Sequence, residues 1–302
     1  MNLEIDKRNE LQIKDYVKSF LDYIDVKDKT IETYKIALKQ FCSYLKDHNI
    51  KTPTREDIIE YRENLKESLK PNTVNSYLIA IRNLYNYLEY EGITKNVTKN
   101  IKGMSVGEEH KRNSLTEEQC KNVLDNALNN REKIIFLLGV ICGLRAKEIV
   151  NIQISDFKEK DGKICLYVLG KARDYKQDFV VVPNDLFELI KEYVNEYNIN
   201  NYLFISSSNH NHNGKLTTKT IRLIVKDMFR RVGIEGDEYS FHSCRHSFAT
   251  LSIKNGIDIR EVSQALRHRS LQTTTIYLHD LEKLNNHCSN SISNILLSKE
   301  GI

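Results

Sequence analysis

The chain has 302 residues, of which 40% are hydrophobic and 28% charged; this length and composition favour two domains with ordinary cores. Its formal net charge of +4 at pH 7 allows a nucleic-acid partner without requiring one. Its longest apolar run, Ile134–Cys142, is too short to span a bilayer, and its amino terminus, MNLEIDKRNE, lacks the apolar core of a signal peptide. The six cysteines form no CxxC pair, so neither a zinc site nor a disulfide framework is indicated, and we expect reduced thiols in a cytoplasmic protein.

Apolar residues recur at helical spacing between Leu11 and Tyr90 and predict four helices with polar joints. The expected helices are, in order, one with apolar residues from Ile13 to Ile24, one opening at Thr30, one over Ile58–Leu69 with a capped start at Thr54, and one over Thr73–Tyr90 after a break at Pro71. Four helices in a segment of this length indicate a small independent bundle. The polar, lysine-rich segment Glu91–Arg112 is expected to be a linker.

The rest of the chain is expected to combine helices with one β-hairpin. The expected elements are, in order, a helix capped by Thr116, a buried helical region over Asn130–Val150 interrupted near Gly143, strands over Ile164–Leu169 and Phe179–Val182 joined by a turn at residues 170–174, a helix over Asp185–Tyr197, a polar loop over Ser206–Gly214, and helices over Thr217–Val232, Ser240–Asn255 and Ile257–Leu266. Ser270 can cap a further helix, and the apolar residues of Leu278–Ile302 predict a terminal amphipathic helix.

Side chains with useful chemistry gather in residues 239–279, YSFHSCRHSFATLSIKNGIDIREVSQALRHRSLQTTTIYLH. His242 and Arg245 lie one turn apart on one helix face, His268 follows the next helix, and Tyr277 would lie on the second turn of a third. Two imidazoles, a guanidinium and a phenol suit a phosphodiester, because cations and donors can hold the phosphoryl oxygens while a hydroxyl attacks phosphorus.

These residues resemble the carboxyl-terminal signature of the tyrosine recombinases, also called the phage integrase family, whose pattern is H-x-L-R-H-[ST]-x-A-T, then L-G-H, then Y-x-H. The chain has H-S-C-R-H-S-F-A-T starting at His242, L-R-H ending at His268, and Y-L-H starting at Tyr277. It departs from the pattern at Cys244, where the family has leucine, and at Arg267, where the family has glycine. The second departure makes the backbone beside His268 harder to predict.

Two other segments carry the same resemblance. Residues 142–149, C-G-L-R-A-K-E-I, look like the family's T-G-L-R-x-x-E-L box, and Gly170-Lys171 matches the start of its G-K-x-x-[KN]-x-R hairpin. By residue chemistry alone, Arg145 and Glu148 could be a local ion pair and Lys171 a solvated turn residue. The resemblance instead implies that Arg145 reaches the scissile phosphate, that Glu148 supports the site, and that Lys171 enters the minor groove.

The resemblance implies a transesterification in which the Tyr277 hydroxyl attacks phosphorus and forms a 3′-phosphotyrosyl link with a free 5′-hydroxyl, without metal, nucleotide or other cofactor. The implied catalytic residues are Arg145, Lys171, His242, Arg245, His268 and Tyr277, with Glu148 in support. The two arginines would hold the non-bridging oxygens, the histidines would supply donors or proton transfer, and the lysine would protonate the departing 5′-oxygen. His246 directly follows Arg245 and is expected to point away from its helix face, and His279, two residues after Tyr277, is expected to face away from Tyr277. Both are expected to be structural hydrogen-bonding residues rather than catalytic ones.

The amino-terminal bundle is consistent with a helical domain that has no ligand or, by resemblance, with the family's core-binding, SAM-like domain. T-x-x-x-Y and the T-V-x-x-x-L-x-x-I-R segment carry that resemblance. The DNA contacts that it implies are Lys29, Thr33, Lys35, Lys39, Lys70, Asn72, Thr73, Asn75, Ser76 and Arg82. A second basic set, on the helix Thr217–Val232, is either solvated or lies against DNA; it consists of Lys219, Arg222, Lys226, Arg230 and Arg231.

We therefore expect a mainly α fold with a small β-hairpin or sheet, in which an α+β catalytic domain follows a four-helix core-binding domain. The expected boundaries are residues 1–92 for the core-binding domain, 93–113 for the linker, and 114–302 for the catalytic domain with a carboxyl-terminal exchange helix. The leading hypothesis is a site-specific recombinase of bacterial or mobile-element origin that acts through a Holliday junction. A type IB DNA topoisomerase and a catalytically inactive DNA-binding protein are the alternatives.

The expected partner is double-stranded DNA with short inverted-repeat core sites, because few residues precede the first predicted helix and leave no room for a separate arm-binding domain. We expect a homotetramer on DNA that is a monomer or weak dimer when free. No membrane association is expected, and the expected location is cytoplasmic and nucleoid-associated. Strand exchange among four protomers would favour a recombinase, whereas relaxation of supercoils by a monomer would favour a topoisomerase.

Overall fold

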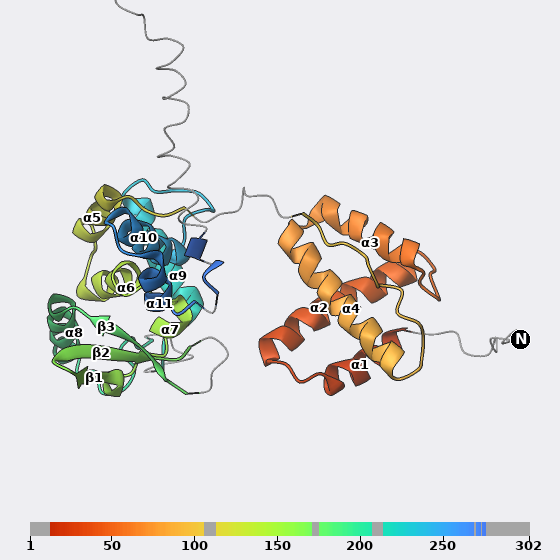
Figure 1. Cartoon of the computed structure of the whole chain (residues 1–302), viewed down its shortest axis with the longest axis horizontal. Helices are drawn as coiled ribbons and strands as arrows, with labels where there is room; N and C mark the ends of the chain where they lie inside the picture. The colour runs from red at the N-terminus through yellow and green to blue at the C-terminus, as the bar shows by residue number, and fades with distance from the viewer. Residues whose placement is uncertain are drawn as a thin grey trace, which may run out of the picture. The chain divides into compact units, whose positions relative to one another are not determined.

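The computed structural model describes residues 13–105, 113–170, 175–206, 214–268, 270–272 and 274–275. The chain divides into two compact units, Met1–Glu109 and His110–Ile302, coloured from red to yellow and from yellow to blue in Figure 1. Each unit has its own buried hydrophobic cluster. Within the described ranges, none of the helices is long and apolar enough to cross a membrane.

The four helices predicted for the amino-terminal unit are present. They are α1 (Ile13–Tyr23), α2 (Asp28–Asp47), α3 (Arg55–Ser68) and α4 (Pro71–Tyr90). Helix α2 begins earlier than the predicted Thr30, whereas α3 starts after Thr54 as expected, because the Thr54 hydroxyl and the Asp57 carboxylate form a reciprocal cap. Pro71 begins α4 rather than only ending α3, since the first helical position does not need an N–H donor.

The segment after α4, predicted to be a linker, packs against the bundle in its described part, residues 93–105. Ile101 is buried, and its carbonyl accepts a hydrogen bond from Arg82 Nη2 at 2.6 Å. The Asn75 amide forms two hydrogen bonds with the Met104 backbone, at 2.7 and 3.0 Å. The amino-terminal unit therefore extends past its last helix.

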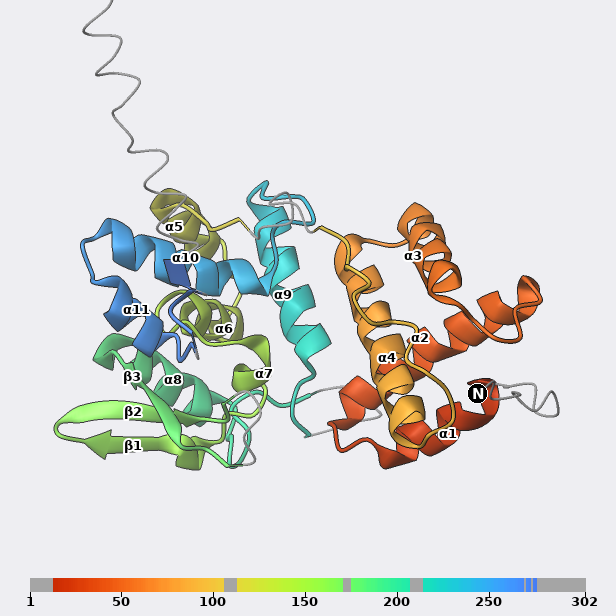
Figure 2. The same ribbon diagram turned by 45° about the vertical axis from the view of Figure 1, so that its right-hand side comes forward.

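The second unit surrounds one buried helix with other helices and a small sheet. Its elements are α5 (Glu117–Asp125), α6 (Asn130–Val140), α7 (Ala146–Ile149), the 3-10 turn η2 (Ile154–Asp156), β1 (Phe157–Lys160), β2 (Lys163–Val168), β3 (Asp178–Val182), α8 (Asn184–Glu196), α9 (Thr218–Arg231), α10 (Phe241–Lys254) and α11 (Ile259–Ala265). Helix α6 lies in the middle, with α5 and α10 towards one end of the unit and the sheet and α8 towards the other (Figures 1 and 2).

The sheet is antiparallel with the order β1-β2-β3, and Leu166 pairs with both Phe157 and Val180. The sequence predicted β2 and β3 but not β1. Strand β1 reads FKEK and has a single apolar residue, so it lacks the run of strand-forming residues that would reveal it. Phe157 packs against Phe187 of α8 with ring centroids 5.6 Å apart, which joins the sheet to the helical layer.

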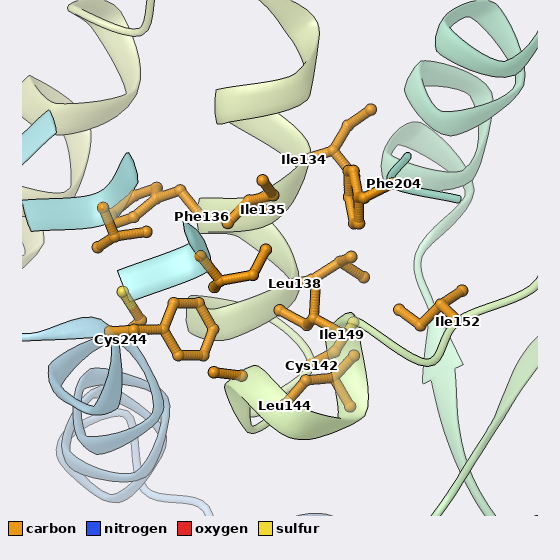
Figure 3. Packing of buried hydrophobic residues seen from close by; sticks show 14 of the residues in the cluster. Ile134, Ile135, Phe136, Leu138, Cys142, Leu144, Ile149, Ile152, Phe204 and Cys244 are labelled. Atoms are coloured by element: carbon orange, nitrogen blue, oxygen red, sulfur yellow. The ribbon is translucent and has the colours of Figure 1, made fainter. Parts of the chain in front are cut away.

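Helix α6 forms the centre of the second core because it is apolar on all sides from Ile134 onward. It packs against α5, α7, α8, α9 and α10. Figure 3 shows Phe136 and Leu138 of α6 among residues from neighbouring segments, with Cys244 on one side and Phe204 on the other. Gly139 permits the close approach to α10, since a Cβ added there would lie 2.7 Å from Cys244 Cβ.

Three expectations fall outside the described residues. They are the hairpin turn at residues 171–174, most of the polar loop at residues 207–213, and the terminal helix within Leu278–Ile302. Of the further helix after Ser270, the structure describes the start: the backbone N–H groups of Thr274 and Thr275 donate to the Leu271 carbonyl at 2.7 and 3.0 Å.

The turn between α6 and α7 should tolerate a side chain poorly. Gly143 has φ +58°, and a Cβ there would lie 2.9 Å from Leu266 Cδ2 and from Phe248 Cδ1. We expect Gly143→Ala to lower the free energy of unfolding by about 1–2 kcal/mol for the left-handed backbone and by roughly 1–3 kcal/mol more for overpacking. Urea denaturation of the full chain, followed by a probe of the second unit, would measure this loss.

The matched control is Gly233→Ala. Gly233 has φ +73°, in the same unit, but a Cβ there would meet nothing within 4 Å, so this variant carries only the backbone cost. Equal destabilisation by the two substitutions would show that packing around Gly143 is not tight.

Candidate active site

Helix α10 places His242 and Arg245 in different environments. Its amino-terminal cap is Ser240, whose hydroxyl accepts a hydrogen bond from the His242 backbone N–H. His242 is exposed, whereas Arg245 is 1% exposed and is the largest of the fully buried side chains. Arg245 donates from Nη1 to the Gly143 carbonyl and from Nη2 to the Leu266 carbonyl. One guanidinium thus joins α10 to the α6–α7 turn and to the end of α11.

Arg145 and Glu148 form the local pair that residue chemistry allowed, but the carboxylate is buried. Arg145 caps α7, and its backbone N–H donates to Glu148 Oε2 at 2.8 Å while Nη1 donates to Glu148 Oε1 at 2.8 Å. The Arg145 side chain is 27% exposed and the Glu148 side chain only 2%. A buried carboxylate with two bonds to one residue holds the Arg145 guanidinium in a defined orientation.

A second arginine reaches the same carboxylate. Arg267 Nη2 donates to Glu148 Oε2 at 2.8 Å, and Arg267 Nη1 donates to the Ala265 carbonyl at 2.8 Å. Burial alone would raise the pKa of Glu148, but the charge of Arg267, the Arg145 N–H and the other guanidinium groups together hold it below its usual value. The sequence did not predict the contact of Arg267 with Glu148. The one feature that could have indicated it is the arginine that stands where the family pattern L-G-H has glycine.

His268 is half-buried and hydrogen-bonded. Its Nδ1 lies 2.8 Å from the hydroxyl of Thr274, which is fully buried. Burial, followed by the nearby charges of Arg245 and Arg145, lowers the pKa of His268 to about 4. The imidazole is therefore neutral at neutral pH and offers one N–H donor rather than a charge. Nothing in the sequence pattern distinguished Thr274 as a partner of His268, because it is one of three consecutive threonines.

His246 lies beside the site. Its ring meets the His242 ring edge to face, with centroids 4.7 Å apart and planes at 85°. His246 therefore shares a helix face with His242, because residues four apart on a helix lie on the same face.

The structure thus brings five side chains close together. Hydrogen bonds link Arg145, Glu148 and Arg267. The charge of Arg245 acts on both Glu148 and His268. Lys171, Tyr277 and His279 lie outside the described residues. Three guanidinium groups act on one carboxylate, so this part of the molecule carries excess positive charge. Over the described part of the chain, no group of three His, Cys, Asp or Glu side chains could hold a metal ion.

The predicted DNA contacts of the amino-terminal unit separate into groups. Lys29, Thr33 and Ser76 line one surface pocket of about 280 Å³, between α2 and α4. Lys70 and Asn72 are exposed and Thr73 is half-buried, all at the start of α4. Lys35 and Lys39 line a different hollow, of about 590 Å³, which also borders α1. Asn75 and Arg82 hold the backbone of the segment after α4.

The basic residues of α9 also separate. Lys219 and Arg222 are exposed near its start. Arg231 pairs with Glu132 and Asp227, and Arg230 lies 3.3 Å from Asp227. Lys226 lies 3.7 Å from Asp237. The basic side chains towards the end of α9 are therefore paired with acidic side chains of the same unit, whereas Lys219 and Arg222 present positive charge at the surface near its start.

Comparisons with known proteins agree with this division into two units. The sequence profile of the phage integrase family matches residues 113–283, and that of the phage integrase N-terminal SAM-like domain matches residues 17–92. The chain is 29% identical over 272 residues to the tyrosine recombinase XerA of Pyrococcus horikoshii, covering 90% of this chain and 91% of that protein. It is also 29% identical over 316 residues to the tyrosine recombinase XerC of Caldanaerobacter subterraneus subsp. tengcongensis, covering 90% and 87%.

Solved structures share the fold. The XerH site-specific recombinase bound to a palindromic difH substrate, in a post-cleavage complex, has a TM-score of 0.75 at 21% identity and covers 94% of this chain and 99% of that one. A lambda integrase (75–356) dimer bound to a COC′ core site has a TM-score of 0.71 at 18% identity and covers 88% and 93%. These likenesses extend over both units.

The environment of His268 predicts how stability depends on pH. The ordinary pKa of the imidazole is 6.5 and its folded value is about 4, so the unfolded chain takes up the proton first as pH falls. The free energy of unfolding should therefore decrease as pH falls from about 6.5 to about 4, and this site should contribute no pH dependence above that window. Glu148, whose folded pKa is also lowered, acts only below 4.5.

Two measurements would check this prediction. Ring-nitrogen NMR titration of the full chain should show one histidine that stays neutral down to about pH 5, and His268→Gln should remove that signal. The variant should also flatten the pH dependence of urea denaturation between pH 6.5 and 4.5. Titration of His268 near 6.5 would mean that its burial and its arginine neighbours have less effect than the geometry indicates.

Proposed function

The chain belongs to the phage integrase family, and from that membership we propose that it is a tyrosine-type site-specific DNA recombinase, which cuts and rejoins strands through a 3′-phosphotyrosyl intermediate and a Holliday junction. The observation that carries the proposal is the cluster of Arg145, Arg245 and Arg267 around one buried carboxylate, beside a neutral His268. A cluster with more cations than anions suits a phosphodiester, whose transition state spreads negative charge over its oxygens.

We assign roles by what each group can donate. Arg145 and Arg245 hold the two non-bridging oxygens, because a guanidinium stays charged and its planar fork matches two phosphate oxygens. Glu148 orients Arg145. His268 supplies a neutral hydrogen-bond donor, and the exposed His242 donates to the phosphate or moves a proton.

In the proposed reaction, the Tyr277 oxygen forms a bond to phosphorus while the bond from phosphorus to the 5′-oxygen breaks. The phenolic proton leaves to a base, and Lys171 gives a proton to the departing 5′-oxygen. The free energy of the broken ester is retained in the protein–DNA ester, so rejoining to another strand needs no nucleotide. The guanidinium groups supply the positive charge that a metal ion brings to other phosphoryl transfers, so no cofactor enters the proposal.

The proposed partner is double-stranded DNA. In the amino-terminal unit, the pocket of Lys29, Thr33 and Ser76 and the start of α4, with Lys70 and Asn72, supply charge and hydrogen-bonding groups for phosphates. In the catalytic unit, Lys219 and Arg222 do the same. We propose that residues 1–92 and 114–302 grip one duplex and that the segment 93–113 joins them.

We further propose that four protomers assemble on two sites made of short inverted repeats, with the carboxyl-terminal segment docking on a neighbouring subunit. The XerA and XerC relatives are named recombinases and match over most of this chain, which supports recombination over the relaxation of supercoils by a topoisomerase. The proposed catalytic residues are all present in the sequence, which argues against an inactive DNA-binding protein.

Tyr277→Phe tests the nucleophile. The change removes one hydroxyl and no positive charge, so DNA affinity and its salt dependence should be unchanged, whereas the covalent adduct should disappear. The substrate is a nicked duplex carrying the inverted repeats found beside the gene, and the readout is a protein–DNA band that survives denaturation. A covalent band formed by the phenylalanine variant would assign the nucleophile to another residue.

Lys171→Ala tests the general acid. A substrate whose 5′-bridging oxygen is replaced by sulfur has a leaving group with a pKa of about 8.5, against roughly 15.7 for water as a guide to an alcohol, so sulfur can leave without a proton. Lys171→Ala should cleave normal DNA about 10²–10⁴-fold more slowly than the parent, but the sulfur substrate nearly as fast.

Arg145→Ala is the control for that experiment. Its proposed task is to hold charge on the non-bridging oxygens, so sulfur at the bridging position should not rescue it. Equal impairment of Lys171→Ala on both substrates would return this lysine to the solvated turn of a hairpin.

A further inference from the structure

Arg267 occupies a backbone position that favours glycine. Its φ is +55°, which costs a non-glycine residue roughly 1–2 kcal/mol. The turn closes α11 through two hydrogen bonds, from Arg267 N to the Gln264 carbonyl at 2.8 Å and from His268 N to the Ser263 carbonyl at 3.1 Å. This is the Schellman pattern, with Arg267 at the position where glycine is most common.

The residues on either side of Arg267 belong to the site. Leu266 gives its carbonyl to Arg245, and His268 is one of the proposed catalytic residues. The conformation of this turn therefore sets where an acceptor of Arg245 and an imidazole lie. The free-energy cost of an arginine in this backbone conformation must therefore be offset by the contacts of its side chain.

Those contacts are buried and charged. The Arg267 side chain is 9% exposed, and its Nη2 forms an ion pair at 2.8 Å with Glu148, which is 2% exposed. Its Nη1 donates to the Ala265 carbonyl within the same turn. Glu148 Oε2 thus receives two donors, one from the turn after α11 and one from the Arg145 backbone, while Oε1 receives Arg145 Nη1.

We propose that Arg267 is a positioning residue of this recombinase, which fixes the Glu148 carboxylate and through it the phosphate-binding guanidinium of Arg145. Arg145 and Glu148 are three residues apart on α7, so their pair can move with that short helix. The bond from Arg267 connects the pair to an element more than a hundred residues later in the chain, the same element that holds His268.

The activity readout of this inference depends on the proposed recombinase function. Its central variant is Arg267→Gly, which removes the guanidinium and also the backbone cost. The variant should melt no lower than the parent, whereas cleavage of the nicked inverted-repeat duplex should slow by about 10- to 100-fold, the size of loss that a misplaced reacting group causes. DNA affinity should change little.

Three further variants assign the effect to the ion pair. Arg267→Lys should lose part of the rate, because an ammonium cannot reach Glu148 and Ala265 with a planar fork. Arg260→Ala removes an exposed charge from the same helix and should cleave at the parental rate. In a Glu148→Gln background, Arg267→Gly should slow cleavage by a much smaller factor than in the parent, since residues that act through one contact are not additive.

A readout without DNA separates failure of this inference from failure of the proposed function. The charges that face His268 are Arg245 and His242 on α10, Arg145 at the start of α7, and Arg267 itself. Arg267→Gly in the free protein should therefore raise the pKa of His268 in an NMR titration, whether or not the chain cleaves the chosen duplex.

Several results would overturn the inference. They are parental cleavage by Arg267→Gly, the same fold loss in both Glu148 backgrounds, a melting temperature well below that of the parent, and an unchanged His268 titration. If the parent itself forms no adduct with DNA while the His268 titration shifts as expected, the proposed function fails and the link from Arg267 to the site stands.

Discussion

The buried guanidinium of Arg245 is the constraint on which the catalytic unit depends. Removing a cation from water costs several kcal/mol unless it is well hydrogen-bonded, and Arg245 meets this requirement with two backbone carbonyls that belong to different turns. One carbonyl belongs to a left-handed residue, Gly143, whose φ is +58°. The other belongs to Leu266, which directly precedes a left-handed residue, Arg267, whose φ is +55°. Two unusual turns are therefore explained by one buried charge.

The Glu148 carboxylate adds the opposite charge that this cluster needs. It lies between Arg145 and Arg267 and is close enough to Arg245 for that charge to lower its pKa. The result is a rigid group of ions joined to the apolar core around α6, which packs directly against α10. The packing of the core therefore also determines where the proposed phosphate-binding groups lie, because α10 carries Arg245 and packs on α6.

The sequence predicted the helices well where their apolar spacing was regular, and short motifs placed several of the candidate site residues on the right helices and turns. His242 and Arg245 are one turn apart on α10 as expected, yet one is exposed and the other buried, because burial depends on what packs against the helix. The contact of His268 with Thr274 and that of Arg267 with Glu148 were not predictable from spacing. Both depend on how turns from separate parts of the chain meet.

The separation of the contacting residues along the chain has a consequence for synthesis on the ribosome. The bond from Arg245 to the Gly143 carbonyl joins residues 102 positions apart. The bond from Arg267 to Glu148 joins residues 119 apart, and the bond from the Leu115 backbone to Ser247 joins residues 132 apart. The first half of the catalytic unit therefore emerges with Glu148 still lacking Arg267 and with the Gly143 carbonyl still lacking Arg245. A nascent chain therefore cannot assemble the cluster of Arg145, Glu148, Arg245 and Arg267 until α11 and the turn after it have left the ribosome.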